Sequence, residues 1–288
     1  MDFLLTLVLN GLGYAMLLFL MAAGLSLIFG LMNVVSLVHG SFFMLGAYFG
    51  LTIARLTHNF WLALLLAPLP AAALGCVLEM LFMRRLYQRG HRDQVLLTFG
   101  FTFVFLDMVR SFWGNDIQGL PVPPELAGAV EIAGNLFPVY RIFLIGLGFA
   151  LALVLWLFLE RSRVGAMVRA SVDDAVTAVG IGINVPALFT GIFSLGVALA
   201  ALGGIAAAPA LAVYPGMDVD IMIPAFIVIV VGGMGSLRGA FLGSLLIGEA
   251  DAFGKAYLPS TALFLIYLVM VTVLLTRPRG FFGIKRAA

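Results

Sequence analysis

Long, uncharged apolar runs dominate this sequence and limit what it can fold into. The run from Phe3 to Phe29 holds no charged residue, and neither does the run from Ile142 to Leu159. A transmembrane helix needs about 20 mostly apolar residues. Because these runs lack the alternation of membrane-barrel strands, the sequence predicts an all-α bundle that crosses a membrane many times.

The composition excludes most other classes of protein. Charged residues make up 10% of the chain, against about 25% in soluble domains. So few polar side chains cannot cover the surface of a soluble fold of this size. The net charge of +2 supplies no basic field for a nucleic acid. We therefore expect the chain to contact membrane lipid and no nucleic acid.

Further apolar runs bring the expected number of membrane segments to about eight, with limits of seven and nine. Three of these runs are short and lie next to glycines, so we expect short or re-entrant segments there. All segments belong to one predicted transmembrane domain, residues 1–288. The runs beyond the first two are 42–53, 61–83, 95–113, 188–210, 221–231, 240–253 and 263–276.

Basic residues collect in three stretches and predict the orientation of the chain. The stretches 84–94, 160–186 and 277–288 hold eleven of the 16 Lys and Arg residues. Alternation through the clear spans puts all three on one side, and Lys and Arg are enriched in cytoplasmic loops. We therefore expect the C-terminus in the cytoplasm. The N-terminus and the loop 114–140, which has no Lys or Arg, are expected outside.

The sequence contains no catalytic or metal-binding pattern. The three histidines, His39, His58 and His91, are scattered and lack the spacing of metal ligands. The stretch Gly248–Lys255 resembles a phosphate-binding loop, but it has five residues between its glycines instead of four. Ala256 also replaces the Ser or Thr that binds magnesium. The sequence therefore predicts a non-catalytic protein without a cofactor, a metal or an ATP site of its own.

A polar, amphipathic segment occupies residues 160–186 on the predicted cytoplasmic side. We predict a helix over 166–179, ended by Gly180. One interpretation is an ordinary helix lying in the membrane interface. The adjacent carboxylates of Asp173 and Asp174 disfavour contact with anionic lipid, so the segment is better interpreted as a docking helix for a cytosolic partner.

Polar and glycine residues interrupt one apolar block in each half of the chain. Non-helical backbone at membrane depth must be buried in protein or line a cavity, and corresponding interruptions in two halves indicate a substrate path. Tight cytoplasmic turns between short spans are the other interpretation. A buried ionisable group on a span is also a candidate. The path candidates are Asn33, Ser36, His39, Gly40, Ser41, Gly232, Gly233, Gly235, Ser236 and Glu249.

Five stretches, in order along the chain, resemble the permeases of branched-chain amino acid ABC importers. Residues 29–48 (FGLMNVVSLVHGSFFMLGAY) resemble the family's first-half signature, and residues 161–185 resemble its cytoplasmic coupling loop. Residues 193–208 are similar to the helix that follows, 230–248 to the glycine-rich signature, and 277–283 to the tail. Together they cover nearly the whole chain.

The resemblance implies a multi-pass subunit of an ATP-driven importer in the bacterial inner membrane. Such a permease pairs with a second, homologous permease. Two cytosolic ABC ATPase subunits hold ATP and magnesium, and a periplasmic substrate-binding protein delivers the amino acid. The coupling segment would be 160–186. The ATPase-coupling residues implied by the resemblance are Arg163, Gly165, Arg169, Asp173, Asp174, Ala178 and Gly180.

The substrate stays open at this point. Ser41 stands where the family often has an acidic residue, and Ser36 stands where Asn is common. Relatives in the same family carry urea, short-chain amides or aromatic acids. An ion-coupled secondary transporter, which needs no ATPase, is the alternative from another class. The sequence thus predicts half of a translocation path for branched-chain or related amino acids.

Overall fold

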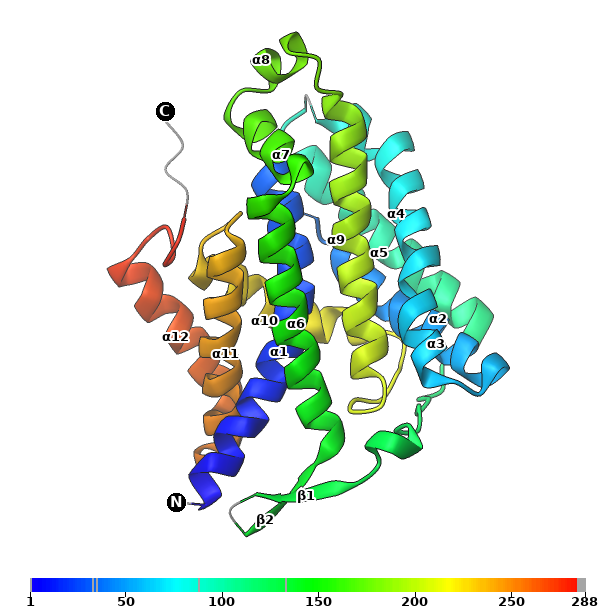
Figure 1. Cartoon of the computed structure of the whole chain (residues 1–288), viewed down its shortest axis with the longest axis vertical. Helices are drawn as coiled ribbons and strands as arrows, with labels where there is room; N and C mark the ends of the chain where they lie inside the picture. Colours follow the sequence, from blue (N-terminus) through cyan, green and yellow to red (C-terminus); the bar gives the residue numbers. More distant parts are fainter. Residues whose placement is uncertain (1, 33, 35, 88, 133, 284–288) are drawn as a thin grey trace.

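The computed structural model describes residues 2–32, 34, 36–87, 89–132 and 134–283, and these form a helical bundle with one small hairpin (Figure 1). The hairpin pairs β1 (Ala129–Ile132) with β2 (Asn135–Pro138). The helices are α1 (Asp2–Met32), α2 (His39–Thr57), α3 (Phe60–Leu66), α4 (Pro68–Leu81), α5 (His91–Trp113), α6 (Val139–Arg161), α7 (Arg163–Asp173), α8 (Ala175–Gly180), α9 (Val185–Ala207), α10 (Met217–Gly232), α11 (Leu237–Tyr257) and α12 (Ala262–Thr276). Short 3-10 turns are η1 (Met83–Leu86), η2 (Pro124–Leu126) and η3 (Pro259–Thr261).

The predicted all-α membrane fold is confirmed. Among the described residues, six helical stretches are long and apolar enough to cross a membrane. Helices α10 and α11 form a pair bent by 120°, and counting this pair as one span gives seven. Seven is the lower limit of the predicted range. Helix α2 has 19 residues, but it is not among these six stretches, because its polar first turn and Arg55 lower its hydropathy.

Helix α1 is the central element of the bundle. It has 31 residues, which corresponds to about 46 Å at 1.5 Å per residue, and 83% of its apolar window is buried. It contacts α6, α9, α10 and α11. By contrast, α5, α6 and α12 are each buried over only 17% of their windows. Their apolar side chains therefore form much of the outer surface of the bundle.

Two of the basic stretches lie close together at one end of the bundle. The beginning of α1 and the β1–β2 hairpin lie at the lower end in Figure 1, and α7 and α8 lie at the upper end. Arg84 donates hydrogen bonds to the Pro186 carbonyl oxygen at 3.4 Å and to Thr190 Oγ1 at 2.6 Å. Arg238 pairs with Glu160 at 3.1 Å. These contacts bring the basic stretches at 84–94 and 160–186 to one end of the molecule.

The segment between α6 and α9 forms two short helices, whereas the sequence predicted one helix over 166–179. The break falls at Asp174, whose backbone is extended (φ −151°, ψ 99°). Its Oδ1 accepts hydrogen bonds from the N–H groups of Val176 at 2.9 Å and Thr177 at 3.1 Å. Asp is a strong helix N-cap, so this residue ends α7 and starts α8.

Candidate functional site

Helix α2 begins inside the bundle, beside the last third of α1. A Cβ atom added at Gly24 would lie 2.8 Å from His39 Nε2. Gly24 precedes Met32, the last residue of α1, by eight residues, which is about 12 Å along the helix axis. Helix α2 therefore starts about 12 Å below the upper end of α1. Asn33, a predicted path residue, lies outside the described residues.

Helix α10 begins at the same depth as α2. Ser41 Oγ donates a hydrogen bond to Asp218 Oδ2 at 3.0 Å, and a Cβ added at Gly40 would lie 2.7 Å from the Asp218 carbonyl oxygen. Two helix N-termini, each with a partial positive charge, therefore meet inside the protein. Broken helices in transporters direct such N-termini at anionic groups of a substrate.

Asp218 was missed by the sequence reasoning, although its position offers a signal. It is an acidic residue at the start of an apolar run, and its side chain is buried to 1% exposure. Among the described residues, its Oδ1 has no hydrogen-bond partner, and neither have the hydroxyls of the buried Ser26 and Ser36. Buried polar atoms normally have partners, so such atoms are a signal of function.

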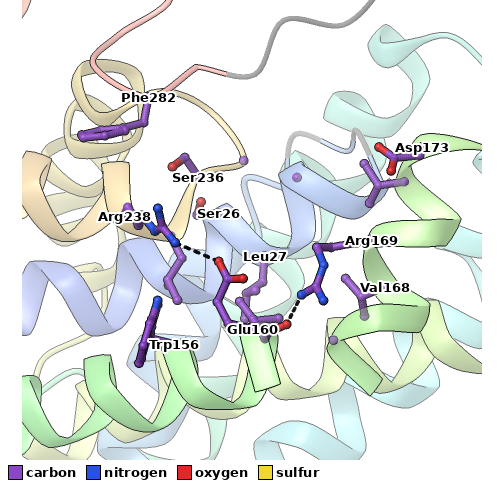
Figure 2. Close-up of a pocket in the computed structure, with 16 residues that line it drawn as sticks. Ser26, Leu27, Trp156, Glu160, Val168, Arg169, Asp173, Ser236, Arg238 and Phe282 are labelled. Carbon is purple, nitrogen blue, oxygen red and sulfur yellow. Dashed lines mark hydrogen bonds and ion pairs between the residues drawn. The ribbon is translucent and has the colours of Figure 1, made fainter. Parts of the chain in front are cut away.

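A cavity of about 480 Å³ opens at the upper end of α1 (Figure 2). Its walls come from α1, α6, α7, the turn between α10 and α11, the start of α11 and the segment after α12. The lining residues are Ser26, Leu27, Gly30, Trp156, Leu159, Glu160, Gly165, Val168, Arg169, Val172, Asp173, Gly235, Ser236, Leu237, Arg238 and Phe282.

This upper cavity brings two predicted sets of residues together. Gly165, Arg169 and Asp173 belong to the predicted coupling set, and Gly235 and Ser236 belong to the predicted path set. These sets are far apart in the sequence, and neither composition nor periodicity joins them. A movement of α7 would therefore change the shape of a cavity that α11 also lines.

Two hydrogen bonds fasten the beginning and the middle of α7 to the end of α6. The Ser162 hydroxyl accepts a hydrogen bond from the Gly165 N–H at 2.9 Å. The Arg169 guanidinium donates to the Leu159 carbonyl oxygen (Figure 2). Arg163 is the first residue of α7, and its side chain is exposed. Hence α7 follows α6 closely, while its outer face stays accessible.

Helix α8 presents apolar side chains at the upper tip of the molecule. Val176, Val179 and Ile181 are 82%, 57% and 70% exposed. Ala178, which the resemblance put in the coupling set, is turned inward and is 2% exposed, whereas Gly180 is exposed. The three exposed apolar residues were not among the sequence candidates. Their signal is a set of large apolar residues that directly follows the acidic pair Asp173 and Asp174.

The glycine-rich interruption in the second half forms the turn between α10 and α11. Gly233 (φ 103°) and Gly235 (φ 82°) have positive φ angles, which side-chain-bearing residues rarely adopt. Gly232 ends α10. Ser236 caps α11, since its hydroxyl accepts a hydrogen bond from the Gly239 N–H at 3.1 Å. The interruption is thus a tight turn that also forms part of the cavity wall.

The segment after α12 covers this turn. The N–H of Phe281 donates to the Val231 carbonyl oxygen, and the N–H of Phe282 donates to the Gly232 carbonyl oxygen, both at 2.9 Å. The last carbonyl groups of a helix have no partners within the helix, so these bonds complete the end of α10. Phe282 also lines the upper cavity.

A second cavity, of about 590 Å³, lies at the lower end of α1. It is lined by three helices, α1, α6 and α11, and by the loop that follows α9. Among the described residues, the two cavities share no lining residue. The lining residues are Phe3, Thr6, Leu7, Asn10, Gly13, Tyr14, Leu17, Arg141, Leu144, Ala210, Leu211, Asp251, Ala252, Lys255 and Ala256.

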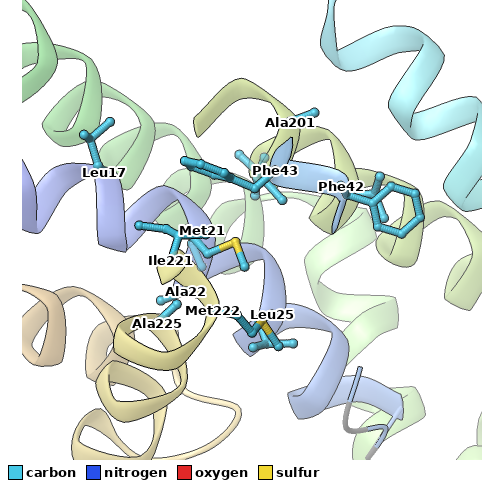
Figure 3. Close-up of a cluster of buried hydrophobic side chains, with 14 of the residues drawn as sticks. Leu17, Met21, Ala22, Leu25, Phe42, Phe43, Ala201, Ile221, Met222 and Ala225 are labelled. Carbon is cyan, nitrogen blue, oxygen red and sulfur yellow. The ribbon is translucent and has the colours of Figure 1, made fainter. Parts of the chain in front are cut away.

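Packed apolar side chains, called the barrier below, fill the bundle at the level of α1 that lies between the two cavities (Figure 3). Leu17 lines the lower cavity and Ser26 lines the upper one, so about 13 Å of α1 lies between them. Close-packed protein interiors leave few voids large enough for a water molecule. The barrier is made of Leu17, Met21, Ala22 and Leu25 of α1, Phe42 and Phe43 of α2, Ala201 of α9, and Ile221, Met222 and Ala225 of α10.

Two further acids, Glu249 and Glu79, lie apart from both cavities. Glu249 on α11 faces α1, since a Cβ added at Gly11 would lie 2.7 Å from its Cδ. Within the described part of the chain, its carboxylate oxygens have no hydrogen-bond partner. The structure thus does not bring Glu249 to the other path candidates. Glu79 accepts hydrogen bonds from Tyr87 and Thr190, both at 2.6 Å, and thereby ties α4 to α9.

A helical membrane bundle with a cavity at each end of one buried helix, and a closed barrier between them, is the arrangement of a solute permease. The model of one protein family, the permease component of branched-chain amino acid transport systems, matches residues 7–274. The chain belongs to this family. It is a non-catalytic, multi-pass transmembrane subunit that works with partner subunits.

Curated relatives match the chain along nearly its whole length. The high-affinity branched-chain amino acid transport system permease protein BraD of Pseudomonas aeruginosa is 27% identical, over 95% of this chain and 94% of BraD. The permease protein LivH of Escherichia coli K12 is 26% identical, over 92% and 90%. A probable LivH of Methanocaldococcus jannaschii is 27% identical, over 94% and 90%.

Proposed function

We propose that this chain forms half of the translocation path of an ATP-driven importer for branched-chain amino acids. The observation that carries the proposal is the upper cavity, which is lined by residues of α7 and by Gly235 and Ser236 of the α10–α11 turn. The names of the relatives, which all refer to branched-chain amino acid transport, support the substrate class.

The proposed partners are a second homologous permease, two cytosolic ABC ATPase subunits and a periplasmic binding protein. In the bacterial inner membrane, the end that carries α7 and α8 would face the cytoplasm, and the beginning of α1 would lie outside. The basic residues support this orientation, because cytoplasmic loops carry an excess of Lys and Arg.

In the proposed mechanism, the two cavities belong to the outward and inward parts of the path, whose other half the second permease supplies. The apolar tip of α8, with Val176, Val179 and Ile181, docks on an ATPase subunit. Closure of the ATPase dimer pushes α7, which moves with the end of α6 because of the Arg169–Leu159 contact. This motion reshapes the upper cavity and opens the barrier, while ATP and magnesium stay on the partner subunits.

The docking step is tested with Val176→Asp in the complete importer, reconstituted in liposomes with internal ATP. A charged residue at a buried apolar contact is costly, so we expect the ATPase subunits to dissociate and leucine uptake to stop. Val130→Asp in the hairpin is the matched control, because Val130 is also exposed but lies at the other end. Intact co-purification and uptake in Val176→Asp would contradict the docking assignment.

The energy source and the substrate are tested with the unmodified importer. Leucine uptake should depend on internal ATP and should not change when an uncoupler removes ion gradients. Uptake that follows an ion gradient instead would indicate the secondary transporter. Uptake of urea, acetamide or an aromatic acid, with none of leucine, would keep the importer but replace its substrate class.

A further inference from the structure

The lower cavity combines charges of both signs with an apolar wall. Arg141 projects from α6, and its guanidinium donates a hydrogen bond to Asn10 Oδ1 on α1. Asp251 on α11 is paired with Lys255 at 2.6 Å, and the side chain of Asp251 is only 8% exposed. The Lys255 ammonium also lies 5.2 Å from the centre of the Tyr14 ring.

These charges come from opposite sides of one groove. Helices α6 and α11 both contact α1, so Arg141 and Asp251 line the cavity from different walls. The cavity has free space at Gly13, beside Arg141, where an added Cβ would meet only Arg141 Cβ, at 4.0 Å. Leu17, Leu144 and other apolar residues complete the lining.

We infer that this lower cavity binds a free amino acid with a branched aliphatic side chain, with its carboxylate at Arg141 and its ammonium group at Asp251. The inference rests on the proposed function and adds a location and a binding mode to it. The leucine side chain would lie against Leu17 and Leu144, next to the closed barrier.

The chemistry of each wall suits one part of this ligand. The planar guanidinium of Arg141 presents paired donors that match a carboxylate. An ionised carboxylate such as Asp251 only accepts hydrogen bonds, so it suits an ammonium group. Lys255 is 64% exposed at its side chain and flexible, so an incoming ammonium group can replace it while it keeps its contact with Tyr14.

The size of the cavity also fits a small ligand. Small-molecule sites commonly enclose about 300–1,000 Å³ and are mostly apolar with a few placed polar groups. The lower cavity encloses about 590 Å³. It lies at the end of α1 opposite to α7 and α8 (Figure 1), where a binding protein would release its cargo.

The inference is tested by equilibrium binding of labelled leucine to the reconstituted complex of the two permeases and the two ATPase subunits. The binding protein is left out of this measurement. Two competitors each keep one charged group of leucine: 4-methylpentanoate lacks the ammonium group, and 3-methylbutylamine lacks the carboxylate. In Arg141→Gln we expect leucine to bind about tenfold more weakly, the loss for one charged hydrogen bond, and to lose its advantage over the amine. In Asp251→Asn, leucine should no longer bind more tightly than 4-methylpentanoate.

Matched controls separate these effects from a general loss of charge. Arg55→Gln and Asp116→Asn remove a cation and an acid that are both exposed and do not line the cavity. Both control variants should bind leucine as the unmodified importer does. Ligand selectivity in the two test variants is a readout that a merely misfolded protein would not show.

A second variant fills the cavity without changing its charge. Gly13→Leu should abolish leucine binding, because its side chain would enter the space between the two walls. Gly146→Leu is the control, since an added Cβ there meets nothing within 4 Å and Gly146 does not line the cavity.

Unchanged leucine affinity and selectivity in Arg141→Gln, Asp251→Asn and Gly13→Leu would overturn the cavity assignment while the proposed importer function stands. Failure of the unmodified importer to bind or carry leucine, together with uptake of another solute, would overturn the proposed substrate and this inference together.

Discussion

Ser41 donates a hydrogen bond of 3.0 Å to Asp218, 177 residues further along the chain, and this bond joins the first turns of α2 and α10. The resemblance drew attention to Ser41 because the family often has an acidic residue there. The structure supplies a carboxylate to the same place from α10. Sequence reasoning cannot find such a pair, since nothing in either segment specifies that the two helices begin at one depth.

The first prediction concerns this bond. Ser41→Ala leaves the buried carboxylate of Asp218 without its side-chain partner, which costs about 1–3 kcal/mol. We expect a lower midpoint of thermal unfolding in detergent and reduced leucine uptake. Ser244→Ala is the matched control, because Ser244 is equally buried but donates only to the nearby Phe241 carbonyl oxygen. Equal effects of the two substitutions would contradict a special role for the pair.

The second prediction concerns the turn between α10 and α11. At Gly233 the φ angle is 103°, and an added Cβ would lie 2.8 Å from the carbonyl carbon of Phe282. Gly233→Leu should therefore displace the segment after α12 and stop transport, while the protein still inserts into the membrane. Uptake and membrane expression measure the two effects.

Gly134 provides the control for backbone strain in that experiment. Its φ angle is 76°, but an added Cβ there meets nothing within 4 Å. Gly134→Leu thus introduces a similar conformational penalty without crowding, and transport should persist. Full activity of Gly233→Leu would show that the turn is only a connection.

The third prediction separates the adjacent acids of the coupling segment. Asp174→Ala removes the cap of α8, so the apolar tip should lose its shape and ATPase binding should weaken. Asp173→Asn leaves the cap intact and alters only the upper cavity, so the ATPase subunits should still co-purify. Size-exclusion chromatography of the assembled importer measures both. Loss of the ATPase subunits in Asp173→Asn alone would contradict these assignments.

The cap should also depend on pH. The hydrogen bonds from Thr177 lower the pKa of the Asp174 carboxyl group below its ordinary value of 3.8. A group whose pKa is lowered on folding contributes its full stabilisation above the ordinary value and loses it as the pH falls through the folded value. The Asp174 cap should therefore be complete at neutral pH, and docking should weaken only in acid.

The sequence was sufficient for the bundle and for the position of its basic end, because long apolar runs and the distribution of Arg and Lys are properties of single segments. It was not sufficient for side-chain directions that depend on packing between distant helices. Ala178 turns inward, and Glu249 faces α1 instead of the path candidates. Both outcomes depend on which helix lies alongside, and no local pattern records that.

The central claim is that two cavities on opposite membrane faces are separated by a closed barrier. It is tested most directly by thiol labelling in a Cys76→Ser background, with Gly13→Cys in the lower cavity and Ser236→Cys in the upper one. In the resting importer, an impermeant reagent should label Gly13→Cys only from outside and Ser236→Cys only from the cytoplasmic side. Labelling of both positions from the same side would contradict the account.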